Sequence, residues 1–217
     1  MAGRNFSICF ICRGNRFRSP LAQVFVERLT LGLPVQASSA GTLEVENAPA
    51  LPEARQIALL CGVDLSEHRS QRLSAVSLEA ADLVIGFEES HVRRAIVDAG
   101  ALRANTFMLR ELVRLLTKSA PAKEAMTVER ARMAVTLADD LRRRDPTAAG
   151  EDTGVPDPFG RSWKVQREIA IQVRDLSLRL TEQVFGVAGS GILLPVPEKI
   201  RRPPRWRWRP RRNRLLR

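Results

Sequence analysis

The sequence predicts an α/β fold in which helices cover both faces of a four-stranded parallel sheet. Short apolar runs typical of buried strands alternate with stretches of helical periodicity, which is the pattern of parallel βαβ units. The first run, 6–11, is apolar on both faces, as expected for a strand inside such a sheet. Active sites in these sheets lie at the carboxyl ends of strands. The loop after residue 11 is therefore a candidate site.

Further apolar runs and amphipathic stretches continue this alternation along the chain. The other expected strands are 35–39, 82–87 and 106–109. The expected helices have apolar residues at three- to four-residue spacing: 19–31, 52–60, 88–99, 111–116, 128–144 and 163–184. Thr127 is the expected N-cap of the fifth. Pro20 suits the first turn of the first helix, where its missing N–H would be unpaired in any case. Ser162 is a suitable N-cap for the last helix.

The segment 187–217 differs in composition from the rest of the chain. It contains nine Arg and one Lys against one Glu, a net charge of +9 out of a total of +11, which leaves 186 residues near +2. It lacks apolar periodicity, which predicts a tail that is disordered on its own. Arg alternating with Trp206 and Trp208 favours an anionic membrane surface, and it also suits nucleic acid. A dispensable solubilising extension is the third interpretation.

The remaining composition indicates a protein of the cytoplasm. The 217 residues are 44% hydrophobic, enough for one domain with a sizeable core. An apolar run of about 20 residues, as a membrane span needs, is not found, and neither is a basic-then-apolar leader. Three cysteines do not make a disulfide framework.

The loop from Cys12 to Arg18 joins the first strand to the first helix. Its backbone N–H groups and those of the first helical turn lack carbonyl partners, and the helix dipole adds positive potential. Such a loop is a cradle for a tetrahedral oxyanion, which Arg18 is placed to close with two parallel hydrogen bonds. Gly14 and Asn15 suit positions with positive φ.

Cys12 lies at the edge of this cradle, where the positive potential stabilises a thiolate. A thiolate that faces a bound phosphate is a nucleophile for phosphoryl transfer, and Ser19 is placed to donate a hydrogen bond to it. Buried cysteines are more often packing residues than nucleophiles. We apply that interpretation to Cys9 within the strand and to Cys61 on an apolar helix face.

Several motifs resemble one known family. The run Cys12-x-Gly14-Asn15-x-x-Arg18-Ser19-Pro20 is similar to the signature of the low-molecular-weight protein tyrosine phosphatases. Three later segments resemble family landmarks in the same order: 38–42, 64–70 and 155–160. The resemblance covers about residues 5–186. It implies a three-layer, flavodoxin-like fold with strand order 2-1-3-4.

The resemblance also assigns roles to residues. Cys12 would be the nucleophile and Asp157 the general acid, which then becomes the base that activates water. Asp157 lies between two prolines, and Phe159 is expected at the substrate rim, with Trp163 as a second candidate. Ser19, Asn15 and His68 would support the loop. The expected phosphate-binding residues are Arg13, Gly14, Asn15, Arg16, Phe17 and Arg18.

The chain departs from the family pattern at several points. Phe17 occupies the position where many members have a second Cys, which is able to form a protective disulfide with the nucleophile. Arg13 at the mouth is expected to favour additional negative charge on the substrate and to disfavour a guanidinium leaving group. Residues 117–154 are expected to be an insertion with one extra helix, which either covers the site or is a surface elaboration.

These observations predict two parts, a catalytic domain over 1–186 and the basic tail over 187–217. The predicted function is phosphomonoester hydrolysis on protein phosphotyrosine through a cysteinyl phosphate, without a metal or another cofactor. One alternative is an arsenate reductase on the same scaffold, which needs additional redox cysteines. The other is a non-catalytic protein that binds phosphate or nucleic acid.

Overall fold

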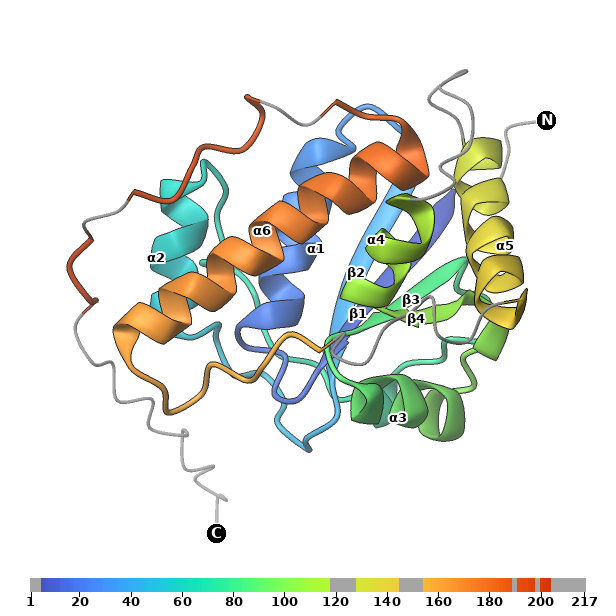
Figure 1. Cartoon of the computed structure of the whole chain (residues 1–217). Helices are drawn as coiled ribbons and strands as arrows, with labels where there is room; N and C mark the ends of the chain where they lie inside the picture. Colours follow the sequence, from blue (N-terminus) through green and yellow to red (C-terminus); the bar gives the residue numbers. More distant parts are fainter. Residues whose placement is uncertain (1–4, 118–127, 145–153, 189–190, 198–199, 204–217) are drawn as a thin grey trace, which may run out of the picture.

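The centre of the protein is a parallel sheet of four strands in the order β2-β1-β3-β4. The computed structural model describes residues 5–117, 128–144, 154–188, 191–197 and 200–203 (Figure 1). The strands are β1 (Phe6–Cys12), β2 (Val35–Gly41), β3 (Leu83–Gly86) and β4 (Thr106–Met108). Every neighbouring pair among them is parallel. The predicted fold class and strand order are confirmed.

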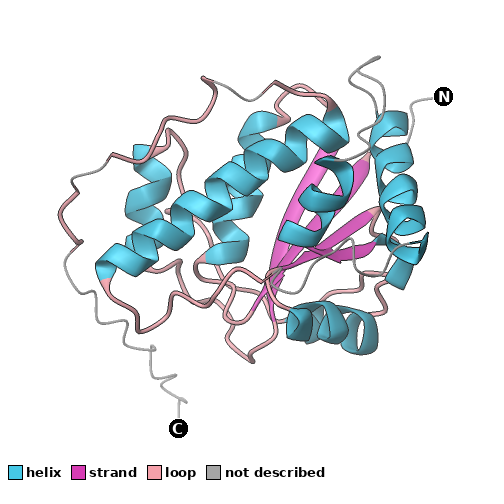
Figure 2. Cartoon of the chain, viewed as in Figure 1, coloured by secondary structure: helices cyan, strands magenta, loops and turns pink. Residues whose placement is uncertain are grey.

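Helices cover both faces of this sheet (Figure 2). α3 lies on one face, and α1, α2, α4 and α6 lie on the other (Figure 1). The helices are α1 (Arg18–Leu29), α2 (Pro52–Leu60), α3 (Glu89–Ala99), α4 (Leu109–Thr117), α5 (Val128–Arg144) and α6 (Trp163–Phe185). Within the described residues, no helix has both the length and the apolar character needed to span a membrane.

The side chains of β1 alternate between the two layers, as the period of a strand requires. Phe10 and Cys12 belong to the larger core under α1 and α6, whereas Cys9 and Ile11 belong to the smaller core under α3. Cys9 and Cys12 therefore lie on opposite faces of the sheet.

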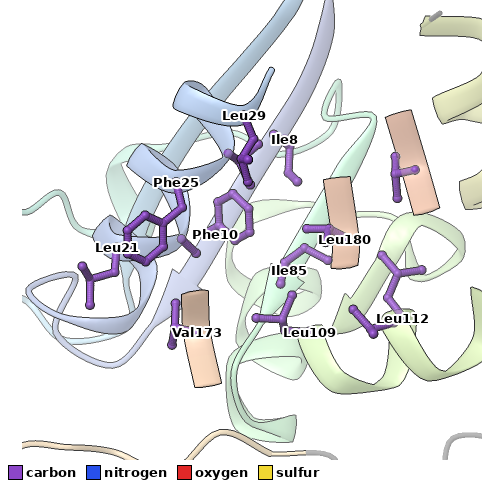
Figure 3. Close-up of a cluster of buried hydrophobic side chains, with 14 of the residues drawn as sticks. Ile8, Phe10, Leu21, Phe25, Leu29, Ile85, Leu109, Leu112, Val173 and Leu180 are labelled. Carbon is purple, nitrogen blue, oxygen red and sulfur yellow. The ribbon is translucent and has the colours of Figure 1, made fainter. Parts of the chain in front are cut away.

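The larger core is built mainly from β1, α1, α4 and α6 (Figure 3). Leu21, Phe25 and Leu29 of α1 pack toward Phe10, which is fully buried. Burial of each such side chain contributes about 1.5–3 kcal/mol relative to exposure. We call the loop from Cys12 to Arg18, which joins β1 to α1, the phosphate loop. Because α6 also packs on α1, the helix that follows this loop is held between the sheet and a second helix.

Helix α5, the described part of the predicted insertion, is fastened beside β4. The Arg142 guanidinium lies 4.1 Å from the ring centre of Phe107 and donates to the carbonyl of Thr106 at 2.9 Å. It also pairs with Asp139 at 2.5 Å. None of the α5 residues lines the pocket at Cys12 described below. Residues 118–127 and 145–153, which include the expected N-cap Thr127, lie outside the described residues.

Several boundaries differ from the predicted ones by a few residues. Strand β2 continues to Gly41 because its ladder with β1 continues as far as the pair of Cys12 and Gly41. Helix α1 ends at Leu29, and the Thr30 hydroxyl that follows donates to the carbonyl of Val26.

Part of the predicted tail is packed against the folded body. We call residues 191–197 and 200–203 the strap. Leu193 is only 2% exposed and joins the larger core, and the Leu194 N–H donates to the carbonyl of Cys61 at 3.2 Å. Apolar anchoring of this kind is not visible in the overall composition of the segment. Residues 204–217, with both tail tryptophans, lie outside the described residues.

Candidate active site

The loop between β1 and α1 is pressed against the end of β2. The Thr42 N–H donates to the Cys12 carbonyl at 3.0 Å, and the Leu43 N–H donates to the Arg13 carbonyl at 2.8 Å. A Cβ atom at Gly41 would lie 3.0 Å from the Asn15 nitrogen and from the Gly14 carbonyl carbon. Only glycine fits this close approach without a backbone shift, so β2 fixes the position of the loop.

Asn15 is the centre of a buried hydrogen-bond network. It is fully buried, and its φ of 49° lies in the left-handed region that Asn tolerates. Its side-chain nitrogen donates to the hydroxyl groups of Ser19 at 2.9 Å and Ser39 at 2.8 Å. Its side-chain oxygen accepts from the Gln71 N–H at 2.9 Å. These bonds hold the loop from three separate segments of the chain.

His68 supports the same loop through its backbone. Its Nε2 lies 2.7 Å from the carbonyl oxygen of Asn15, so Nε2 carries the proton in this contact. Burial lowers the pKa of His68 below its usual value, which keeps the ring neutral near pH 7. The structure thus places His68 and Asn15 together, as the resemblance implied.

Cys12 lies at the base of the pocket with its thiol beside a hydroxyl group. The Ser19 hydroxyl donates to the Cys12 Sγ at 3.0 Å, and both residues are at most 3% exposed. Ser19 itself accepts from Asn15, so the hydroxyl proton is directed toward sulfur. A donated hydrogen bond stabilises the thiolate over the thiol.

Arg18 is buried beneath the pocket and is held on two sides. Its Nη1 donates to the Val155 carbonyl at 2.8 Å and forms an ion pair with Glu88. Its guanidinium carbon lies 5.9 Å from the ring centre of Phe87. Within the described residues, Nη2 is buried without a hydrogen-bond acceptor. Its nearest charged neighbour is the Asp157 carboxylate at 3.4 Å.

Glu88 is a residue of this site that sequence reasoning missed. It follows β3 and precedes α3, at the same carboxyl edge of the sheet as Cys12. Its position directly after a predicted strand could have identified it, because active sites in parallel sheets lie at the carboxyl ends of strands. Its pairing with Arg18 depends on the adjacency of β1 and β3, which the sequence pattern alone does not specify.

Asp157 lies close to two arginines of the phosphate loop. Its carboxylate is 3.4 Å from Arg18 Nη2 and 3.7 Å from Arg13 Nη1, and it accepts from the Phe159 N–H at 3.2 Å. The Val155 N–H donates to the carbonyl of Phe87 at 2.7 Å and ties this loop to the end of β3. The acid loop, residues 154–162, is thereby placed over the phosphate loop.

Together the two loops enclose a cavity of about 280 Å³. Its walls add three apolar side chains that sequence reasoning did not single out, namely those of Leu43, Val45 and Leu51. Phe159 stands at the opening with 70% of its surface exposed. The full lining is Cys12, Arg13, Gly14, Arg16, Phe17, Arg18, Leu43, Val45, Leu51, Asp157 and Phe159.

The second rim candidate, Trp163, does not line this cavity. Its indole N–H donates to the Ile200 carbonyl of the strap at 3.0 Å.

Arg16, another residue of the phosphate loop, donates from Nε to the Pro49 carbonyl at 2.8 Å. Burial lowers the pKa of its guanidinium below the usual value.

The other two cysteines are poorly placed to react. Burial raises the pKa of the Cys9 thiol to about 11, and it raises that of the Cys61 thiol to about 11 as well. Cys9 faces the opposite side of the sheet from Cys12. A thiolate is therefore disfavoured at both positions near pH 7.

The family model described as low molecular weight phosphotyrosine protein phosphatase matches residues 7–121. The chain belongs to this family. The match contains the phosphate loop, His68 and Glu88, and it ends before the acid loop. The predicted resemblance is therefore confirmed, while the role of Asp157 remains a proposal.

Relatives in this family differ in the phosphorylated residue that their names specify. The low molecular weight protein-tyrosine-phosphatase of Streptomyces coelicolor is 35% identical over 161 residues, 71% of this chain and 78% of the relative. The protein-arginine-phosphatase of Bacillus subtilis is 32% identical over 108 residues, 49% of this chain and 71% of the relative.

A third relative is matched over a shorter stretch. The probable low molecular weight protein-tyrosine-phosphatase EpsP of Ralstonia solanacearum is 35% identical over 79 residues, 36% of this chain. The chain thus spans about half, 53%, of that relative's length.

A solved structure has the same fold. The low molecular weight protein tyrosine phosphatase from T. tengcongensis matches with a TM-score of 0.59 and 25% identity, covering 82% of this chain and 99% of the other.

Proposed function

We propose that this protein hydrolyses phosphate monoesters and that its substrates are proteins bearing phosphotyrosine. The observation that carries the proposal is the Cys12 thiol, which accepts a hydrogen bond from Ser19 at 3.0 Å at the base of a cavity that Arg18 and Asp157 also line. A pure phosphate-binding protein has no need of a nucleophile, an anion clamp and a carboxylic acid in one cavity.

The reaction follows from this arrangement in two displacements. The Cys12 thiolate attacks phosphorus, the P–O bond to the tyrosyl oxygen breaks, and protonated Asp157 gives its proton to that oxygen. Asp157 then takes a proton from water, whose oxygen attacks the cysteinyl phosphate and releases phosphate and the Cys12 thiolate. The Ser19 hydrogen bond stabilises that leaving thiolate.

Arg18 and the loop amides stabilise the charge that develops on the equatorial phosphate oxygens. This electrostatic effect is usually the largest single contribution to catalysis. The ion pair with Glu88 and the bond to the Val155 carbonyl orient the guanidinium before substrate arrives. Orientation in advance lowers the cost of reaching the transition state.

The shape of the cavity supports an aromatic leaving group. Cys12 and Arg18 are its most deeply buried polar groups. Leu43, Val45 and Leu51 add an apolar wall, and Phe159 is largely exposed at the opening. An aryl phosphate places its phosphate on the loop and its ring against these apolar side chains.

Phosphoarginine is the second candidate substrate because one relative is named a protein-arginine-phosphatase. Arg13 argues against it, since its exposed guanidinium lies 3.7 Å from Asp157 at the mouth. A substrate guanidinium would meet like charge there. Matched phosphotyrosine and phosphoarginine peptides test this choice, and we expect kcat/KM to be at least about tenfold higher for phosphotyrosine.

Arsenate reduction is less well supported. That reaction needs further reactive cysteines, yet Cys9 and Cys61 are both buried with pKa values raised to about 11.

The deciding experiment is phosphate release from an aryl phosphate with EDTA present. We expect turnover by the wild type, none by Cys12→Ser, and a loss of about two or more orders of magnitude for Asp157→Ala. Cys61→Ala is the matched control, because it removes a thiol remote from the cavity. Full activity of Cys12→Ser, or an inactive wild type, would reduce the loop to a phosphate cradle.

A further inference from the structure

The active-site cavity is lined by three arginines that differ in their acidic partners. Arg18 pairs with Glu88, and its Nη2 lies 3.4 Å from the Asp157 carboxylate. Arg13 Nη1 lies 3.7 Å from the same carboxylate. Arg16, by contrast, forms no ion pair with an Asp or a Glu of the described residues. The described part of the protein thus supplies no counter-charge to one of the three guanidinium groups.

Two hydrogen bonds hold Arg16 beside the apolar wall of the cavity. Its Nε donates to the Pro49 carbonyl at 2.8 Å, and its own carbonyl accepts from the Leu51 N–H at 2.8 Å. Leu51 is itself part of the cavity lining. The donors on Nη1 and Nη2 make no hydrogen bond to the described residues. One edge of the guanidinium is therefore fixed to the protein, and its remaining donors are left for another acceptor.

The electrostatic setting of Arg16 favours an anion. The side chain is half-buried, and burial lowers the pKa of its guanidinium below the usual value because the charged form has lost part of its water. Its positive charge also contributes to the lowered pKa of His68. A cation that has given up water without gaining a counter-charge attracts an incoming anion more strongly than a fully solvated one does.

The phosphate of the substrate is not the natural partner of this side chain. The loop amides and Arg18 already form the phosphate cradle, whereas the Arg16 side chain is tied to the segment that precedes α2. Because Arg16 lies beside Leu51, a substrate ring that packs on this wall brings the groups next to the ring toward the guanidinium. Arginine binds a carboxylate through parallel hydrogen bonds from its planar fork.

We propose that Arg16 is a specificity-determining residue that binds a second anionic group of the substrate, a carboxylate beside the phosphotyrosine. This inference rests on the proposed function and narrows its substrate class to phosphotyrosines that have Asp or Glu next to them in the sequence. Arg13 contributes less to this preference, because its side chain is 63% exposed and Asp157 offsets its charge.

The first test uses the wild type and two phosphotyrosine peptides that differ only in the residues flanking the phosphotyrosine, Glu in one and Gln in the other. The leaving group is the same in both, so a difference in kcat/KM reports recognition. We expect kcat/KM to be at least about tenfold higher for the Glu peptide, and the preference to shrink as salt is added. Equal values for the two peptides overturn the proposal.

The second test asks which arginine produces the preference. We expect Arg16→Gln to reduce the preference for the Glu peptide to about twofold or less, whereas the matched variant Arg13→Gln keeps most of it. Arg16→Lys should keep a preference of about threefold, because the charge remains but the fork is lost. The proposal is wrong if Arg16→Gln slows both peptides equally, which indicates phosphate binding alone, or if Arg13→Gln is the variant that loses the preference.

A third test removes the peptide altogether. The substrates are meta-carboxyphenyl phosphate and its neutral counterpart, meta-carbamoylphenyl phosphate, and the ratio of their kcat/KM values is compared between the wild type and Arg16→Gln. The intrinsic reactivity of the two leaving groups is the same for both proteins, so it cancels in this comparison. We expect the ratio to fall at least about fivefold in the variant. An unchanged ratio contradicts a carboxylate site at Arg16.

The inference and the proposed function fail in different ways. Turnover of both peptides without a preference refutes the second anion site and leaves the phosphatase activity standing. Absence of phosphate release from every one of these substrates refutes the proposed function, and the inference falls with it.

Discussion

The phosphate loop and the acid loop meet at one cavity, but they are held there by different forces. The phosphate loop is contiguous with β1 and α1, and the buried Asn15 network fixes it with neutral hydrogen bonds. The acid loop arrives more than a hundred residues later, and Asp157 faces the phosphate loop through contacts of 3.4 Å and 3.7 Å to arginines. Cys12 is therefore positioned by packing and Asp157 by charge.

Because of this difference, we expect the two loops to tolerate substitutions to different degrees. A buried hydrogen bond is costly to remove because its partner is left unpaired away from water. A partly exposed ion pair is weaker and is screened by salt. We expect substitutions around Asn15 to damage folding and activity together, and substitutions around Asp157 to act on activity alone.

The largest effect is expected for Asn15→Ala. The change removes three side-chain hydrogen bonds worth about 1 kcal/mol each and places Ala at a positive φ for about 1 kcal/mol more. We expect about 4 kcal/mol of lost stability in urea unfolding and a hundredfold or so lower kcat/KM.

Asn47→Ala is the matched control for that prediction. Asn47 also has a positive φ, 55°, but its side chain is exposed. Asn47→Ala should lower the free energy of unfolding only by the cost of placing Ala at a positive φ, about 1 kcal/mol. Equal losses for the two variants would show that backbone strain, and not the network, supports the loop.

A smaller effect is expected from His91, a buried residue of α3. Burial, together with the nearby Arg18, lowers its pKa to about 4, and it is only 2% exposed. The unfolded chain binds this proton near pH 6.5, so stability is complete above that pH, falls as the pH drops toward 4, and levels off below. The loss is on the order of 3 kcal/mol.

Thermal unfolding at pH 7 and pH 4 measures this dependence. We expect His91→Gln to show a smaller decrease in Tm between the two pH values than the wild type. The chain has only one other histidine, and His68→Gln should retain the contribution of His91. Parallel curves for His91→Gln and the wild type would contradict the assignment.

The smallest effect is expected for Arg13→Ala. Its contact with Asp157 spans 3.7 Å, and the Arg13 side chain is 63% exposed. Such a pair contributes about 1 kcal/mol or less, so kcat/KM for an aryl phosphate should fall by about fivefold or less, and the difference should shrink as salt is added. Arg161→Ala removes another exposed cation, within the acid loop itself, and serves as control. A loss approaching that of Asp157→Ala would mean that Arg13 places the acid by itself.

The sequence patterns predicted those parts of the site whose residues are close together in the chain. The buried strand, the loop with Gly14 and Asn15, and the helix from Arg18 follow from patterns within about 25 residues, and the family match extends over them. Sequence reasoning also singled out His68 and Asp157, through resemblance and motif order rather than through geometry, and the structure has His68 against the Asn15 carbonyl and Asp157 in the cavity lining. It missed Glu88, the apolar wall and the strap, because their partners are distant in sequence.

The sequence by itself determined that a strand-to-helix loop with a cysteine would form at the end of a parallel strand. The reason is physical: strand and helix periodicity, and the unpaired amides at a helix start, are properties of short segments. Only the tertiary structure decided that Glu88 pairs with Arg18, that Leu43, Val45 and Leu51 line the cavity, and that residues 200–202 contact Trp163 and α2. These contacts join residues that are far apart in the sequence, so they depend on the order of the strands and on how long loops close. The same local sequence pattern is compatible with many topologies, and it therefore does not specify such contacts.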